Sequence, residues 1–431
     1  MTQDEISTTQ PKTLVLRKTI NNLKAISLII GSVLGSGLMI LPGLVYKNIG
    51  ATSFYSWLIM GIIIIPFLYV FIKLTLEFPS AGGLVNIIRE IFGIHFYYTF
   101  SYLILMSTVI LVPIVAVIGA NYVGYLFDLS NFQIVLVAAF MLIAVTLLNV
   151  FDTSLVLKIQ GFSALLLLLL LFIIIITGSK QAFSEFSVKL SSVNLLSMEM
   201  LFATVMGITF VFWAFLGWEN LSFTTEEFTN IWQDLPKATI ISFAVMMFLY
   251  LGLSISTIGL LPQESRYTSQ APLAEVITLT FGAKYGKIVA AIGILIMVIN
   301  LNAWVWGPSR LLFDCGRKKI LPQVFSRLTK RQTPAVSLLT LLGLYLVILS
   351  YMIITGNYKL DALIQLVNTN FMSLYFFSSA CFVKYANNFE DKVIGHIAMF
   401  LMGLIMAFCG FYILFPLSCF LISWLRKRIK E

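Results

Sequence analysis

The sequence has few charged residues, and this shortage already excludes most kinds of soluble protein. Only 11% of the 431 residues are Asp, Glu, Lys or Arg, while 59% are hydrophobic. A soluble globular domain carries about 25% charged residues. The composition therefore predicts a protein that lies in a membrane over most of its length.

The chain also lacks the residue clusters that metal sites, disulfides and serine-based catalysis need. Its two histidines are far apart, no CxxC pair or GxSxG motif occurs, and the four cysteines are expected to be unpaired packing residues. We therefore expect no metal, no cofactor and no enzymatic activity. The net charge of +9 comes without a basic stripe interleaved with aromatics, so nucleic-acid binding is not expected.

Long hydrophobic runs are what the sequence does have. A bilayer core of about 30 Å needs about 20 apolar residues per helix, and runs of that length recur about twelve times. The sequence thus predicts an all-α polytopic membrane protein with about twelve transmembrane helices. The expected spans are 23–49, 54–77, 96–127, 131–150, 154–178, 200–229, 237–261, 285–313, 333–355, 359–384, 392–409 and 411–425.

The basic residues predict the orientation of these spans, because Lys and Arg accumulate on the cytoplasmic side. If the amino terminus is cytoplasmic, roughly three quarters of the 28 Lys and Arg residues fall on the inner side. We therefore expect cytoplasmic tails at 1–22 and 426–431 and an extracytoplasmic loop at 179–199.

Two of the spans contain sequence that interrupts a helix. These are GSVLGSGLMILPG, from Gly31 to Gly43, and FVFWAFLGWENLSF, from Phe210 to Phe223. Hydrocarbon offers no partner to an unpaired peptide group, so a helix breaks there only where it faces protein, a cavity or a ligand. Breaks at corresponding positions of two halves predict a substrate site near the bilayer midplane.

The two breaks would offer opposite partial charges to a ligand. Gly35 and Gly37 let the chain leave helical geometry, Ser36 adds a hydroxyl, and the half-helix that restarts near Leu38 presents free N–H groups to a carboxylate. Carbonyl groups at Trp213 to Leu216, or at Val33 and Leu34, would accept from an ammonium. An amino acid carries both groups on adjacent atoms. The alternative for the Gly31–Gly35 pair is a helix-packing motif of small residues.

The remaining walls of this site are expected to be apolar, with tryptophans as candidates: Trp213, Trp218, Trp304 and Trp306. Among the acids only Glu219 lies deep in a predicted span, beside the second break. An intramembrane acid is functional by default, so Glu219 is a candidate to exchange a coupling proton. The alternative is a protonated acid that braces the unwound segment. With no other charge at this depth, a neutral, apolar amino acid is the expected substrate.

Four segments in order resemble the amino acid–polyamine–organocation transporter superfamily over nearly the whole chain. Besides the first break, they are EFPSAGGLVNIIREIFG (Glu77–Gly93), FWAFLGWENLSFTTEEFTNIWQDLPKA (Phe212–Ala238) and SRLLFDCGRKKILP (Ser309–Pro322). The EEFTN run, Trp213 and LDALIQLVNTN (Leu360–Asn370) are most similar to bacterial inner-membrane exporters of methionine and branched-chain amino acids.

The resemblance implies a leucine-transporter-like fold, with inverted repeats of five helices at 23–178 and 200–384 and two further helices at 385–425. It implies that the first and sixth helices bind substrate, that Val33, Ser36 and Gly37 meet its backbone, and that Trp213 gates the site. Leu216 would offer its carbonyl, Glu219 would match the acid of proton-sensing members, and Trp304 would line the pocket. The full expected substrate-binding set is Val33, Gly35, Ser36, Gly37, Trp213, Phe215, Leu216, Gly217 and Trp304.

One departure from the family concerns the coupling ion. Proton-coupled importers place a lysine well inside the fifth helix, roughly where Leu167 stands here. The lack of this lysine argues against the importers' way of coupling to protons and leaves the coupling ion open. The overall expectation is a secondary transporter of methionine, leucine, isoleucine and valine in the inner membrane, acting in export with H⁺ as the candidate coupling ion, as a monomer or homodimer. An importer or exchanger of the same fold is the nearest alternative, followed by a channel and an intramembrane enzyme.

Overall fold

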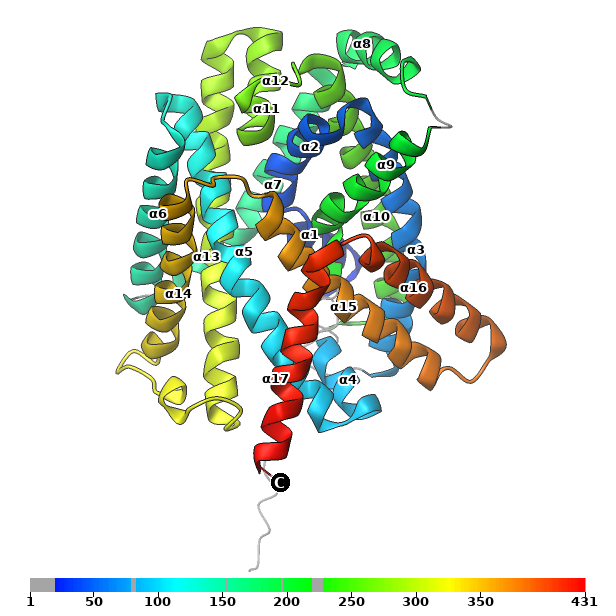
Figure 1. Cartoon of the computed structure of the whole chain (residues 1–431), viewed down its shortest axis with the longest axis vertical. Coiled ribbons are helices and arrows are strands. Elements are labelled where there is room, and N and C mark those ends of the chain that lie inside the picture. Colours follow the sequence, from blue (N-terminus) through cyan, green and yellow to red (C-terminus); the bar gives the residue numbers. More distant parts are fainter. Residues whose placement is uncertain are drawn as a thin grey trace, which may run out of the picture.

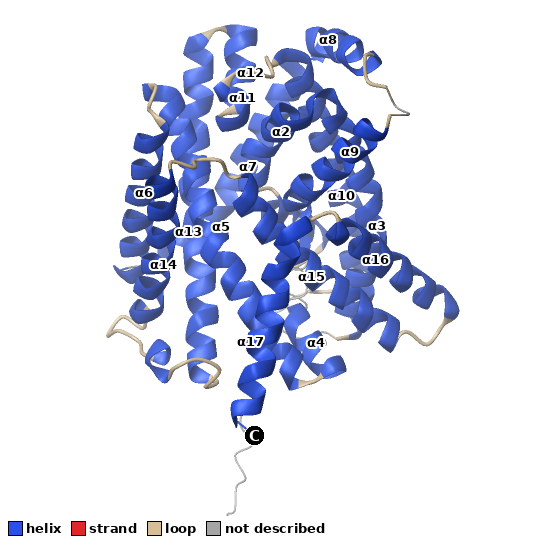
Figure 2. Cartoon of the chain, in the orientation of Figure 1, coloured by secondary structure: helices blue, strands red, loops and turns tan. Residues whose placement is uncertain are grey.

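The structure, a computed structural model, describes residues 20–78, 83–151, 154–177, 179–194, 197–218 and 228–430, and its elements there are helices (Figures 1 and 2). The first half contains α1 (Asn22–Val33), α2 (Ser36–Ile49), α3 (Ser53–Glu77), α4 (Gly83–Phe92), α5 (Ile94–Phe127), α6 (Asn131–Phe151), α7 (Ser154–Thr177) and α8 (Ser179–Ser191). The second half contains α9 (Met198–Val211), α10 (Ile231–Leu260), α11 (Arg266–Gln270), α12 (Pro272–Phe281), α13 (Ala283–Arg317), α14 (Ala335–Thr355), α15 (Asp361–Tyr385), α16 (Phe389–Ala407) and α17 (Leu414–Lys430). Short 3-10 turns are η1 (Gly50–Thr52), η2 (Phe212–Phe215), η5 (Gln323–Ser326) and η6 (Gly410–Ile413).

Long apolar helices confirm the multi-span membrane architecture, but their number differs from the prediction. Among the described residues, eight helical stretches are long and apolar enough to cross a membrane, or nine if the bent pair formed by α7 and α8 is one span. About twelve were expected. The stretch Ser36–Glu77 joins α2 to α3 and has 42 residues, about twice what one crossing needs. Two further helices are not counted as spans. Helix α1 has only 12 residues, and the first turn of α16 contains the charged residues Glu390 and Asp391.

The two longest helices, α5 and α13, pack against each other in the middle of the bundle (Figure 1). In the most apolar part of α5, 83% of the residues are buried inside the protein, against 28% for α14. A helix that is apolar on all sides lies in the interior, whereas α14 turns most of its surface outward. The helices α8, α11 and α12 gather at one end of the bundle, and α4 and the C-terminus lie at the other (Figure 1).

The segment predicted as an extracytoplasmic loop, 179–199, contains the helix α8, which packs on α10. Lys189 of α8 donates from Nζ to the Ile258 carbonyl oxygen at 2.7 Å and to the Tyr46 hydroxyl at 3.2 Å. A cation near the last carbonyls of a helix satisfies them and interacts favourably with the helix dipole. One lysine therefore ties α8 to the end of α10 and to α2. The division of the chain into two repeats remains a prediction.

Candidate functional site

The first predicted break separates α1 from α2. Helix α1 ends at Val33, and Leu34 and Gly35 have extended backbone, with φ/ψ of −68°/108° and −152°/−154°. Gly35 is the N-cap residue of α2 and provides no side-chain hydrogen bond to it. The first N–H groups of a helix have no acceptor within the helix. The Leu38 N–H donates to the Gly35 carbonyl oxygen at 3.2 Å, which leaves the N–H groups of Ser36 and Gly37 available to a ligand. This is the geometry that a carboxylate cradle needs.

The second predicted break follows α9. The chain tightens into η2, Leu216 is extended, and Gly217 has a φ of +115°. Only glycine adopts such a φ without strain. The predicted proton-coupling residue Glu219 lies outside the described residues, and its role stays a prediction.

The two breaks touch each other. The Ser32 hydroxyl lies within hydrogen-bonding distance of the Gly217 carbonyl oxygen, at 3.3 Å. A Cβ atom at Gly217 would stand only 2.7 Å from the Ser32 carbonyl oxygen. Gly217 is therefore required twice, for its backbone conformation and for the close approach of the two unwound segments.

A small cavity of about 40 Å³ lies between the breaks. One water needs roughly 10–15 Å³ on this measure, so the cavity has room for about three waters. An amino acid with a branched side chain is larger, and the walls must move apart to admit it. The lining residues are Ser32, Val33, Gly35, Ser36, Gly37, Leu111, Trp213, Leu216, Gly217, Asn300, Trp304 and Phe371.

Eight of the nine residues in the predicted binding set line this cavity, and the ninth does not. Phe215 is fully buried behind it, where its ring packs 4.8 Å from that of Tyr250 and 6.5 Å from that of Trp57, centroid to centroid. The structure therefore does not bring Phe215 to the cavity, and its role in binding stays a prediction. The tryptophan candidates Trp218 and Trp306 do not line the cavity either, whereas Trp213 and Trp304 do.

The carbonyls predicted to be free at the second break mostly have donors. The Trp213 oxygen accepts from the Leu216 N–H at 3.1 Å, the Phe215 oxygen accepts from the Tyr375 hydroxyl at 3.2 Å, and the Ala214 oxygen accepts from the Tyr250 hydroxyl. Of the four, the Leu216 carbonyl is the best remaining acceptor for an ammonium. The break is held open by two tyrosines that belong to α10 and α15.

Asn300 is a site residue that sequence reasoning missed. Its Nδ2 atom is 3.4 Å from where a Cβ of Gly35 would lie, and its buried Oδ1 atom has no hydrogen-bond partner in the described part of the chain. A buried amide oxygen without a donor is costly unless a ligand supplies one. The signal was present, since an amide stands in the middle of the predicted span 285–313.

The cavity walls carry no charged side chain among the described residues. The groups that can form hydrogen bonds with a ligand are backbone groups, two serines and Asn300, while Leu111, Trp304 and Phe371 provide apolar surface. No group of three His, Cys, Asp or Glu residues that could hold a metal ion is present in the described ranges. The arrangement therefore suits a small zwitterion with a neutral, apolar remainder.

Comparisons with known proteins agree with this chemistry. Residues 20–423 match the model of the amino acid permease family. The chain is 23% identical to the L-methionine/branched-chain amino acid exporter YjeH of Escherichia coli, over 95% of this chain and 96% of that protein. It is 25% identical to the uncharacterized amino acid permease YecA of Bacillus subtilis, over 75% of each chain. It is 26% identical to mouse large neutral amino acids transporter small subunit 2, over 75% of this chain and 63% of that protein.

Proposed function

Because the chain belongs to the amino acid permease family, an amino acid transporter family rather than an enzyme family, we propose that it carries neutral, apolar amino acids by alternating access. The observation that carries the proposal is the uncharged cavity between two broken membrane helices. The ligand's carboxylate would bind the free N–H groups of α2 at Ser36 and Gly37. Its ammonium would bind the Leu216 carbonyl oxygen and the Oδ1 atom of Asn300.

The proposed substrates are methionine, leucine, isoleucine and valine. Leu111, Trp304 and Phe371 would contact their side chains, and a charged side chain would find no partner among the described lining residues. Similarity to YjeH over nearly the full length of both chains supports the same choice, since that protein is an exporter of methionine and branched-chain amino acids. We propose export as the direction, with both termini in the cytoplasm and a monomer or homodimer in the membrane.

The experiment that tests this function is flux of labelled amino acids in proteoliposomes that contain the purified full-length chain. We expect leucine, isoleucine, valine and methionine to be transported across the membrane. Arginine and glutamate should not be transported. The substrate proposal fails if the four are ignored while arginine or glutamate is carried. Direction is tested in cells fed a methionine-containing dipeptide, where export predicts faster release of methionine and import predicts no change.

Proton coupling is tested at Glu219. If this carboxyl takes up and releases the coupling proton, flux through the unmodified protein varies with pH, because the charged and neutral forms of the acid differ in transport. Glutamine copies the neutral form at every pH, so the flux of Glu219→Gln should be independent of pH. An unchanged pH profile in the variant, measured in the same proteoliposomes, would remove the proton role.

A further inference from the structure

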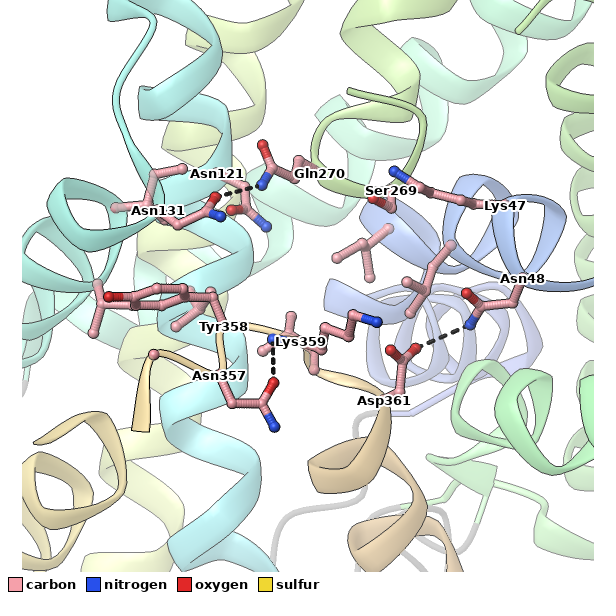
Figure 3. A pocket seen from close by; sticks show the side chains of 17 residues that line it. Lys47, Asn48, Asn121, Asn131, Ser269, Gln270, Asn357, Tyr358, Lys359 and Asp361 are labelled. Carbon is pink, nitrogen blue, oxygen red and sulfur yellow. Dashed lines mark hydrogen bonds between the residues drawn. The ribbon is translucent and has the colours of Figure 1, made fainter. Parts of the chain in front are cut away.

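A second and larger cavity, of about 380 Å³, lies beyond the first one near α11 and the α14–α15 connection (Figure 3). It has the size of a small-molecule site. We call it the outer vestibule. Its lining contains two ammonium groups, on Lys47 and Lys359, one carboxylate, on Asp361, and several amides, including those of Asn48 and Gln270.

Among the described residues, no ion pair within 4 Å joins Lys47 or Lys359 to Asp361. The ion pairs found in the described ranges involve Asp128 and Asp314 as the acids. Asp361 instead accepts a hydrogen bond on Oδ1 from Asn48 at 3.0 Å, which leaves its second oxygen available. The exposed side chain of Lys359 extends into the middle of the cavity, as Figure 3 shows. Lys47 donates to the Ser265 carbonyl oxygen at 3.2 Å.

The cavity between the two breaks is called the central cavity below. The helices α2 and α5 line both the outer vestibule and the central cavity. On α2, Gly37 faces the central cavity and Ile40 the outer vestibule. On α5, Leu111 and Val117 do the same, and six helical residues span about 9 Å. The outer vestibule thus lies next to the central cavity, three residues further along α2 and six residues further along α5. Its apolar lining includes Ile40, Leu44 and Val117.

We infer that the outer vestibule is a second, weaker binding site for the same zwitterionic amino acids, with Lys359 binding the carboxylate and Asp361 the ammonium. The inference rests on the proposed function, because the ligand class is taken from it. A lysine and an acid two positions apart, over an apolar wall, match the two charges and the side chain of a neutral amino acid. Binding is weaker than in the central cavity because exposed charges are solvated and screened by salt.

The test is equilibrium binding of labelled leucine to the purified full-length protein. We expect two phases, of which only the weaker one loses affinity when ionic strength is raised. Lys359→Gln and Asp361→Asn should each raise the dissociation constant of the weaker phase by roughly fivefold and leave the tighter phase unchanged. Asparagine at 361 can still accept from Asn48, so this variant removes the charge alone. Lys287→Gln, an exposed lysine outside the outer vestibule, is the matched control and should change neither phase.

Three results separate the possible failures. A single phase that ignores both variants overturns the outer site and leaves the proposed function standing. A weaker phase that acetate displaces as well as leucine does would overturn the assignment of a zwitterion. Absence of binding for every apolar amino acid, in either phase, would overturn the proposed function itself.

Discussion

Replacing Gly37 by valine is expected to abolish transport while the protein still inserts and folds. A Cβ atom at this position lies 3.3 Å from Cδ1 of Trp213 and 3.5 Å from Cα of Ala214, so the two further methyl groups of valine meet the second break. Overpacking of this kind costs about 1–3 kcal/mol, and relief requires the start of α2 to move away from the cavity. Flux of leucine in proteoliposomes should fall by roughly 100-fold.

The matched control for this variant is Gly343→Val. Gly343 also lies in a predicted membrane helix, α14, but no atom stands within 4 Å of its Cβ position. Its flux should equal that of the unmodified protein. Folding of the Gly37→Val variant is checked by size-exclusion chromatography. If the folded variant retains half or more of the leucine flux, the role of the first break as the carboxylate cradle is contradicted.

Removing the amide of Asn300 is expected to weaken substrate binding by roughly 10- to 150-fold. The Oδ1 atom of Asn300 is buried and has no partner until a ligand's ammonium supplies one. A hydrogen bond to a charged group contributes about 1.5–3 kcal/mol, and each 1.4 kcal/mol is a factor of ten in the dissociation constant. The measurement is the tighter phase of leucine binding to Asn300→Ala.

Asn302→Ala provides the comparison that isolates this effect. Asn302 stands two residues further along α13, where its Oδ1 atom accepts from Nδ2 of Asn149 at 2.5 Å instead of lining the cavity. Its loss should lower the thermal stability of the protein and leave the dissociation constant of leucine unchanged. Equal loss of affinity in both variants would show that Asn300 acts on the fold and not on the ligand.

Local composition allowed both breaks to be predicted. Gly35 and Gly217 stand where the backbone leaves helical geometry, whereas Gly37 already belongs to α2 and is needed for its close approach to Trp213 and Ala214. A glycine is costly in a membrane helix unless the chain turns or approaches a neighbour there. The sequence motif therefore marks the break itself. Together with the family resemblance, this composition pointed to eight residues that line one cavity in the structure.

What the sequence did not reveal depends on contacts between distant segments. The ring of Phe215 turns toward Tyr250, 35 positions further along the chain, and no local pattern encodes this choice. The donors that occupy the carbonyls of Ala214 and Phe215 come from α10 and α15. A crossing made of two short helices, such as α1 and α2 with 12 and 14 residues, is likewise not recognised by the length of either helix alone.

The hydroxyl of Ser32 gives the contact between the breaks an unusual property. It lies 3.3 Å from the Gly217 carbonyl oxygen but only 2.9 Å from that of Ile29 in its own helix. Tyr122 fastens α2 to α5 at the Met39 carbonyl oxygen, and two other tyrosines fasten the second break to its neighbours. The boundary between these two parts runs through the cavity. The Ser32 hydroxyl can lose its contact with the Gly217 carbonyl oxygen and still donate to the Ile29 carbonyl oxygen. Separation of the two breaks therefore costs little hydrogen bonding at Ser32, because its hydroxyl keeps the Ile29 carbonyl oxygen as an acceptor.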